Sequence, residues 1–245
     1  MNLREIFQAH DGALVHKWNH YFEIYERYFS KYRNREITML EIGISHGGSL
    51  ALWKKYFGDG LRLYAIDVNP ECKKLESENV TIFIGSQSDP TFLQTVIDQC
   101  PPFDIILDDG GHTMQQQIIS FEKLFPQVKN DGIYICEDTL TSYLYEYHGG
   151  YKKKNSFIEF SKNLIDKLHA WHIPPPKKIK VDDYTKTIQS IHFYDCMVVI
   201  EKTIPKEAPY TLQKGKKTIA DYREPELRKH HLFSKIILKL KTIFK

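Results

Sequence analysis

A doubly wound α/β fold is the architecture that the sequence predicts, and three observations support it. Short apolar runs alternate with helix-like segments from residue 37 to residue 136, which favours right-handed crossovers and a mostly parallel sheet covered on both faces. Polar and acidic residues follow these runs, where the ligands of such sheets bind. The last two runs are joined by only Tyr194-Asp195, too short for a crossover, so the final strand is expected to run antiparallel.

The chain divides into three regions by its pattern. Residues 1–34 form an N-terminal helical lead, in which aromatic side chains recur at helical intervals and are expected to pack. Residues 35–202 form a cofactor-binding domain, and residues 203–245 form a basic C-terminal extension. Within the domain, the pattern predicts strands at 37–42, 61–66, 80–84, 103–107, 132–136, 187–193 and 196–201, and helices at 49–57, 115–125 and 155–170.

Composition places the chain among ordinary globular proteins. The 245 residues suffice for one full core, and 42% apolar with 27% charged residues is typical of soluble domains. A formal charge of +3 is too small to indicate a nucleic-acid partner. No run approaches the ~18 apolar residues that span a bilayer, and Met1-Asn2-Leu3-Arg4-Glu5 lacks the layout of a signal peptide. The four cysteines form no CxxC pair, which favours reduced thiols in the cytoplasm.

The C-terminal extension ends in a basic amphipathic segment. Residues 228–245 contain lysines and an arginine but no acidic residue, and their apolar residues fall on one side of a helix. Such a helix can lie on an anionic surface, which would make the protein peripheral to the inner membrane. Amphipathic helices more often pack on protein, so a membrane contact is the less expected interpretation, and the segment can equally pack against a partner subunit or lead into a further domain.

The first predicted strand ends in a glycine-rich turn. Glu41-Ile42-Gly43 is followed by Ile44-Ser45-His46-Gly47-Gly48-Ser49. Ser45 stands where the GxGxxG dinucleotide fingerprint has its second glycine, the residue that lets backbone approach a pyrophosphate. The pattern therefore argues against a nucleotide-binding oxidoreductase and favours a nucleotide-like cofactor without a pyrophosphate.

The next two strand ends offer polar groups for a nucleoside. Asp67 ends the second strand, where an acidic residue can accept bonds from both ribose hydroxyls, although an aspartate can also simply cap a turn there. Gln87-Ser88-Asp89 follows the third strand and offers amide and hydroxyl groups for an adenine edge. A plain helix start is the alternative for this segment.

Two adjacent strand ends bring carboxylates to one edge of the predicted sheet. Asp108-Asp109 ends the fourth strand and Glu137-Asp138 the fifth. An oxygen-only cluster suits a hard ion such as Mg²⁺, although one or two of these residues can instead cap helices. His112 follows a Gly-Gly turn and can act as a base. A metal that acidifies a hydroxyl beside a base favours an oxygen acceptor, because an amine nucleophile does not need the ion.

Over roughly residues 15–202 the sequence resembles the magnesium-dependent sugar O-methyltransferases related to the mycinamicin and tylosin enzymes. The resemblance implies the Rossmann-like class I methyltransferase fold, with a seven-stranded sheet and one reversed strand. Its most specific parts are Asp108-Asp109-Gly110-Gly111-His112 and Glu137-Asp138-Thr139. It also rests on Lys17-Trp18-Asn19-His20-Tyr21, Leu40-Glu41-Ile42-Gly43, Gly47-Gly48-Ser49-Leu50, Tyr64-Ala65-Ile66-Asp67, Gly85-Ser86-Gln87 and Ser190-Ile191-His192-Phe193-Tyr194-Asp195.

The resemblance implies a role for each matching residue. His112 and Asp109 are the expected catalytic residues, with His112 as general base. Asp109, Glu137 and Asp138 are the expected ligands of Mg²⁺ or a similar divalent ion. S-adenosyl-L-methionine, which becomes S-adenosylhomocysteine, is the expected cofactor, and Gly43 would leave room for its methionine portion. The expected cofactor-binding residues are Tyr21, Glu41, Gly43, Ser49, Asp67, Gln87, Ser88 and Asp108.

The family's acceptors are sugar hydroxyls, on glycosylated natural products or on surface glycans and their nucleotide-activated precursors. The resemblance therefore implies a small sugar substrate, possibly nucleotide-linked, a link to capsule or polysaccharide biosynthesis, and a homo-oligomer. Val15-His16 stands where the family often has Thr-Asp, and Leu140 where a histidine is common, so the acceptor can differ. The alternatives are a non-sugar acceptor (a phenol, an amine or a polyketide hydroxyl) and a non-catalytic cofactor-binding module.

Overall fold

The computed structural model describes residues 1–174 and 179–222. Met1–Pro209 form one compact unit, and a second unit begins at Tyr210. Residues 210–222 form neither helix nor strand. The amphipathic helix expected at 228–245 lies outside the described residues. Within the described ranges, no helix has the length and apolar character needed to cross a membrane.

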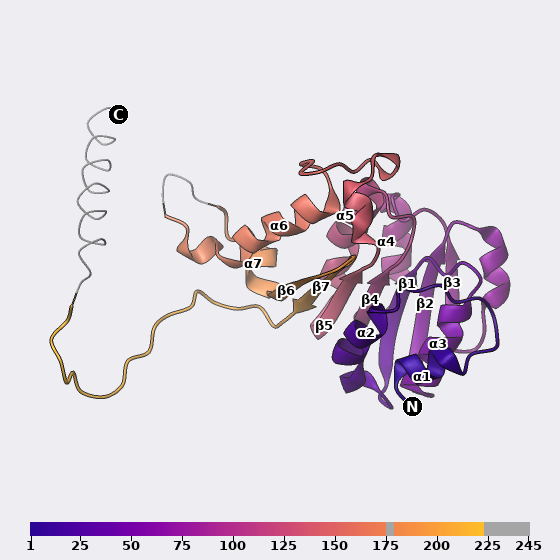
Figure 1. Cartoon of the computed structure of the whole chain (residues 1–245), viewed down its shortest axis with the longest axis horizontal. Helices are drawn as coiled ribbons and strands as arrows, with labels where there is room; N and C mark the ends of the chain where they lie inside the picture. The colour runs from indigo at the N-terminus through magenta and orange to yellow at the C-terminus, as the bar shows by residue number, and fades with distance from the viewer. Residues whose placement is uncertain (175–178, 223–245) are drawn as a thin grey trace. The chain divides into compact units, whose positions relative to one another are not determined.

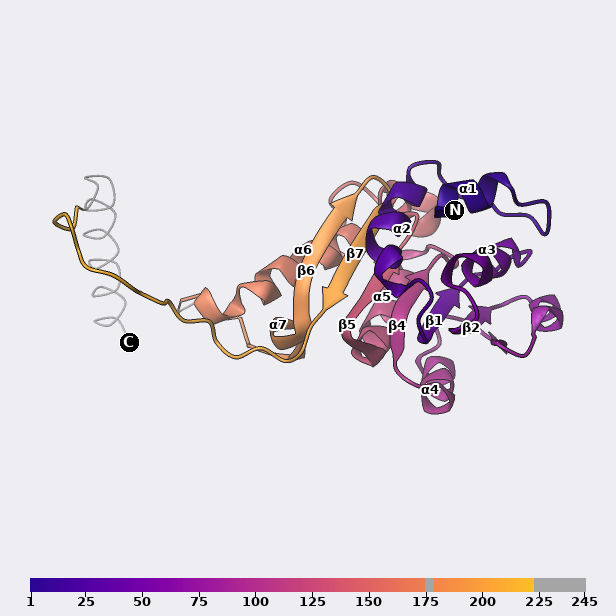
Figure 2. The same cartoon turned by 90° about the horizontal axis from the view of Figure 1, so that it is seen from below.

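The compact unit is built on a seven-stranded sheet in the order β3-β2-β1-β4-β5-β7-β6. The strands are β1 (Ile37–Ile42), β2 (Leu61–Asp67), β3 (Val80–Ile84), β4 (Phe103–Asp108), β5 (Val128–Cys136), β6 (Ile188–Tyr194) and β7 (Met197–Lys202). All neighbours pair in parallel except β7, which is antiparallel to both β5 and β6 (Figure 2). The single reversed strand and the reversal of strand order at β1 and β4 confirm the predicted fold.

Helices cover both faces of the sheet (Figure 1). They are α1 (Leu3–Gln8), α2 (Tyr21–Phe29), α3 (Gly48–Phe57), α4 (Pro90–Gln99), α5 (Met114–Leu124), α6 (Phe157–Leu168) and α7 (Asp183–Thr187). Successive strand side chains point to opposite faces, so Met39 joins the apolar cluster under α1, α2 and α3, whereas Leu40 joins the cluster under α4, α5 and α6. The two clusters hold the sheet between two helical layers.

The N-terminal lead is helical at its two ends and irregular between them. Asp11-Gly12, a pair that favours turns, interrupts the helical pattern after α1, and residues 9–20 run without helix or strand until α2 begins. We call residues 9–20 the N-terminal strap. It lies against the start of α3, because a Cβ on Gly48 would stand 2.3 Å from the Ala13 carbonyl oxygen and 2.4 Å from that of Leu14. The aromatic residues of α2 are buried, as expected.

Candidate active site

A cavity of about 520 Å³ opens where several parallel strands end, as the fold rule predicts. The strap forms one of its walls. Its lining comes from residues 14–17 of the strap, 42–45 at the end of β1, 66–69 at the end of β2 and 109–112 after β4. Single residues of neighbouring segments, including Ser49, Gln87 and Asp138, complete it. The cavity is within the size range of small-molecule sites.

The glycine loop after β1 is shaped by two of the predicted residues. Gly43 has a φ of +83°, and a Cβ there would stand 2.1 Å from the Asp109 carbonyl oxygen. The close approach of the turn after β4 therefore requires glycine at this position, whether or not a ligand also needs the space. Asp67 Oδ2 accepts from the backbone N–H groups of Ile44 at 3.0 Å and Ser45 at 3.1 Å. Asp67 thus orders the loop and also lines the cavity.

Asp108 and Gln87 form a buried support beneath the β4 turn. The Gln87 amide donates to Asp108 Oδ1 at 2.9 Å and accepts from the Gly111 N–H at 2.8 Å, while the Tyr134 hydroxyl donates to Asp108 Oδ2 at 3.0 Å. Burial raises the pKa of Asp108 to about 7. A Cβ on Gly110 would lie 1.9 Å from Gln87 Oε1, so the turn closes tightly on this amide. These contacts set the direction in which the following residues leave the sheet.

Glu41 is a second buried carboxyl beside the glycine loop. Its Oε2 accepts from the Ser49 hydroxyl at 3.0 Å, and Ser49 itself lines the cavity. Glu41 Oε1 is buried with no hydrogen-bond partner among the described residues. Burial raises the pKa of this carboxyl to about 7.

Asp109, Glu137 and Asp138, which follow β4 and β5, form what we call the acidic rim. A lysine of the strap neutralises its inner part, Asp109 and Glu137. Lys17 Nζ donates to Asp109 Oδ2 and, at 2.9 Å, to Glu137 Oε2, and its side chain is only 4% exposed. Burial alone would lower the pKa of Lys17, but the charges of Asp109 and Glu137 raise it above its ordinary value. The Tyr25 hydroxyl donates to Glu137 Oε1. Burial and Asp109 raise the pKa of Glu137, while Lys17 and Tyr25 oppose this change.

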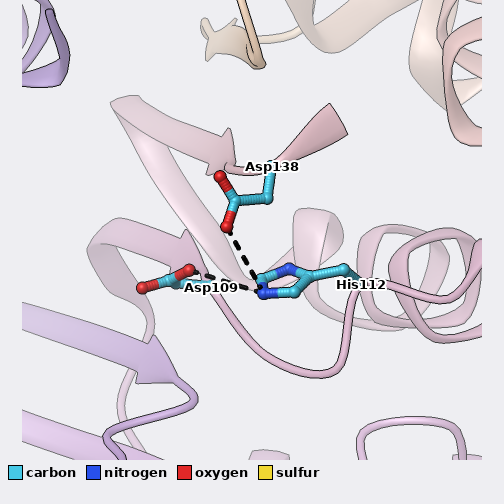
Figure 3. A group of neighbouring side chains, drawn as sticks. All are labelled: Asp109, His112 and Asp138. Carbon is cyan, nitrogen blue, oxygen red and sulfur yellow. Dashed lines mark ion pairs between the residues drawn. The ribbon is translucent and has the colours of Figure 1, made fainter. Parts of the chain in front are cut away.

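The outer part of the rim consists of Asp109, His112 and Asp138, which line the cavity and whose side chains converge (Figure 3). His112 Nε2 lies 3.8 Å from Asp109 Oδ1 and 3.5 Å from Asp138 Oδ2. One ligand atom from each of these three side chains lies within 4.8 Å of the others. His112 and Asp138 both have positive φ, +57° and +51°, a conformation that non-glycine residues rarely adopt outside constrained sites. The backbone is thus strained at the two residues that face each other across the rim.

Asp138 is held from behind by two aromatic side chains. The Tyr21 hydroxyl donates to Asp138 Oδ1 at 2.8 Å, and the Trp18 indole N–H donates to the same oxygen at 3.0 Å. Burial and the nearby carboxylates raise the pKa of Tyr21 above its ordinary value, which keeps the hydroxyl a donor. With Oδ1 occupied in this way, Oδ2 is left facing His112.

The structure separates the predicted site residues into two groups. Those that line the cavity are Gly43, Ser49, Asp67, Gln87, Asp109, His112 and Asp138. Those that are not part of its lining are Tyr21, Glu41, Ser88, Asp108 and Glu137. Tyr21, Glu41, Asp108 and Glu137 are buried and bonded to the first group or to its neighbours. Ser88 bonds to Ser86, through hydroxyl groups 2.9 Å apart. The roles assigned to all of these residues stay predictions.

Sequence reasoning missed what Lys17 and Trp18 do. They stand in the Lys17-Trp18-Asn19-His20-Tyr21 motif of the resemblance, and the strap that holds them forms neither helix nor strand. Their partners lie 92 and 120 residues further along the chain, which no local pattern reveals.

Comparisons with known proteins match the site to a family. Residues 40–139 match a family model described as a methyltransferase domain. The 8-demethyl-8-alpha-L-rhamnosyl tetracenomycin-C 2'-O-methyltransferase of Streptomyces olivaceus is 33% identical over 196 residues, 76% of this chain and 51% of that protein. The demethylmacrocin O-methyltransferase of Streptomyces fradiae is 33% identical over 207 residues, 79% of this chain and 52% of that protein. The chain thus spans about half the length of the curated relatives it matches.

Solved structures extend the likeness to the whole sheet. The MycE methyltransferase from the mycinamycin biosynthetic pathway, in complex with Mg, SAH and mycinamycin VI, is 25% identical with a TM-score of 0.77, over 89% of this chain and 57% of that one. A second MycE structure, with Mg and SAH, is 26% identical with a TM-score of 0.77, over 94% and 59%. The chain therefore contains a methyltransferase domain of the class I fold, and it resembles the magnesium-dependent sugar O-methyltransferases of the mycinamicin and tylosin type.

Proposed function

We propose that this protein is an S-adenosylmethionine-dependent, divalent-metal-assisted O-methyltransferase that acts on a sugar hydroxyl. The observation that carries the proposal is the convergence of Asp109, His112 and Asp138 at the cavity formed by the glycine loop. The named relatives are O-methyltransferases of glycosylated natural products, which supports a sugar acceptor. They give no support to the expected link with capsule or polysaccharide biosynthesis.

The cavity fits the cofactor in its chemistry. Asp67 lies at the end of β2, with its carboxylate at the cavity wall where a ribose would bind. Ser49, whose hydroxyl donates to the buried Glu41, offers a further polar group in the cavity lining. S-adenosylmethionine has no pyrophosphate, so the loop does not need the second glycine of the dinucleotide fingerprint, and Ser45 can stand there.

The donor set also fits a hard divalent ion. Asp109 and Asp138 offer oxygen ligands, and the His112 ring lies within the same group. When bound, such an ion would acidify a sugar hydroxyl and offset its developing charge. The expected role of Glu137 as a third carboxylate ligand requires the Lys17 ammonium to give up its contact, because both Glu137 oxygens accept bonds from Lys17 and Tyr25.

The residues of the chain account for the remaining steps. His112 presents Nε2 toward the rim, where it would take the proton of the acceptor hydroxyl. Thr141 fixes the His112 backbone by donating to its carbonyl oxygen at 2.9 Å. The strap forms one wall of the cavity and would limit the access of water to a bound cofactor. Methyl transfer then needs only in-line approach of the acceptor oxygen.

The test is a binding measurement followed by an acceptor screen. Calorimetry is expected to detect S-adenosylhomocysteine binding without NAD binding, and tight NAD binding would contradict the cofactor assignment. A panel of simple glycosides, nucleotide sugars and non-sugar phenols is then incubated with S-adenosylmethionine and Mg²⁺, and methylated products are read by mass spectrometry. Sugar products that vanish with EDTA and in Asp138→Asn, but persist in the exposed control Asp59→Asn, are the expected result. Methylation of phenols alone would point to the non-sugar alternative.

A further inference from the structure

Trp18 is a large apolar side chain placed at the edge of the site and left uncovered. It is 49% exposed, although its indole N–H is bonded to Asp138 Oδ1 at 3.0 Å. Trp53, in contrast, is 1% exposed and packs edge-on against Tyr25 and Phe29 in the core. Trp18 thus keeps about half of its surface open to solvent while its polar edge is fixed to the rim.

The strap directs Lys17 and Trp18 to different carboxylates of the rim. Lys17 points inward to Asp109 and Glu137, whereas Trp18 stays outside and reaches Asp138 with its ring edge. The ring is fixed beside the outer part of the rim, where Asp138 Oδ2 faces His112 at 3.5 Å.

We propose that the exposed ring of Trp18 is the platform on which the sugar ring of the acceptor stacks, so that a ring hydroxyl reaches Asp138 and His112. This inference rests on the proposed function and names the residue that selects a sugar. A pyranose carries C–H groups on one face and hydroxyls around its edge. An indole supplies a large, rigid apolar surface for that face, and the carboxylates and imidazole receive the edge.

Trp18 could instead serve only to position Asp138 through its N–H group. Two substitutions distinguish this structural role from acceptor stacking. Trp18→Phe keeps an aromatic surface but loses the N–H bond to Asp138. Trp18→Gln keeps an N–H donor but loses the aromatic surface. If Trp18 is the platform, Trp18→Gln raises the KM for a glycoside acceptor by about tenfold, with little change in Mg²⁺ affinity, and Trp18→Phe retains most acceptor binding.

Fluorescence gives a readout that does not depend on turnover. The protein with Mg²⁺ and S-adenosylhomocysteine is titrated with methyl α-L-rhamnopyranoside while tryptophan emission is followed. A saturable change is expected in the unsubstituted protein and in the control Trp171→Phe, and its loss is expected in Trp18→Phe. A change that persists in Trp18→Phe, or no saturable change in the unsubstituted protein, overturns the proposal.

The kinetic arm completes the test with the acceptor found in the screen. A Trp18→Gln variant with an unaltered KM, alongside a Trp18→Phe variant that has lost Mg²⁺ affinity, would show that Trp18 only positions Asp138. Failure of the proposed function gives a different result, because the unsubstituted protein then neither binds S-adenosylhomocysteine nor methylates any sugar. That result would also overturn the proposal that Trp18 stacks on the acceptor.

Discussion

The inner and outer parts of the acidic rim share Asp109 but differ in how their charge is balanced. In the inner part, the side chains of Glu137 and Lys17 are 1% and 4% exposed, and the protein supplies its own cation. In the outer part, the side chains of Asp138 and His112 are 26% and 19% exposed, and they face a cavity. The fold thus neutralises its buried carboxylate with its own lysine, whereas the exposed carboxylate remains available to a ligand.

Electrostatics explains why the two parts cannot be exchanged. A buried carboxylate without a partner loses the hydration that stabilises its charge, so Glu137 needs Lys17 and Tyr25. Asp138 keeps access to solvent, and two neutral donors are enough to fix its orientation. Substitutions in the inner part are therefore expected to lower stability, and substitutions in the outer part to lower activity.

His112 tests the outer part and carries the largest expected effect. His112→Ala removes the proposed base, so kcat is expected to fall roughly 10²–10⁴-fold, as for other general bases. The free energy of unfolding should stay close to that of the unsubstituted protein, because the ring is partly exposed. Steady-state kinetics and urea unfolding measure the two quantities, with the exposed His169→Ala as control. Near-normal turnover would reduce His112 to a packing residue.

Lys17 tests the inner part. Lys17→Met leaves Asp109 and Glu137 without their buried cation, and breaking such a pair is expected to lower the free energy of unfolding by about 3–5 kcal/mol. Urea unfolding followed by circular dichroism gives the value, and Lys17→Arg provides the matched variant that keeps the charge. Adding Glu137→Gln to Lys17→Met should recover part of the loss. A loss below about 1 kcal/mol, the level of an exposed pair, would break the comparison.

Glu41 extends the comparison to a buried carboxyl that forms no salt bridge within the described residues, although the charge of Lys17 opposes part of its pKa shift. Burial raises its pKa from 4.5 to about 7, so the folded state holds a proton that the unfolded state releases. Stability from this group is therefore present below pH 4.5 and is lost as the pH rises to about 7, by up to about 3 kcal/mol. Glu41→Gln should flatten the unfolding free energy over this pH range. An unchanged profile would show that Glu41 is ionised in the folded protein.

The smallest expected effects concern two tyrosines, one bonded to the inner part of the rim and one to the outer part. Tyr25→Phe removes a donor from the fully buried Glu137, and the expected loss in unfolding free energy is about 2 kcal/mol. Tyr21→Phe removes a donor from Asp138, which keeps the Trp18 N–H and solvent, so the loss should be smaller. Parallel urea denaturation of the two variants decides the ranking, and equal losses would argue against separate inner and outer parts.

The sheet and the meeting of its carboxylates followed from sequence pattern. Alternating apolar runs predicted the strands, and because parallel strands end at one edge, Asp109 and Asp138 had to lie close together. The expected seven strands with one reversed are present. These results depend on periodicities of a few residues, which the sequence displays directly.

The balance of charge at the rim did not follow from pattern. Lys17 lies in a strap with no periodic signal, and its contact with Glu137 spans 120 residues of chain. The positive φ of His112 and Asp138 gives no sequence signal either, since neither residue is glycine. Gly43 was expected to make room for a ligand, yet its added Cβ would collide with the Asp109 carbonyl, a requirement visible only once two loops are placed together.

The strap gives the site an order of assembly. Lys17 and Trp18 are synthesised before the carboxylates they bind, which lie 92 to 120 residues further along the chain. Until those carboxylates are synthesised, the Lys17 ammonium remains hydrated. Closing so long a loop is then a late and slow event in folding. A cut within the strap would therefore leave the sheet strands intact but remove the lysine and the indole that bind its carboxylates.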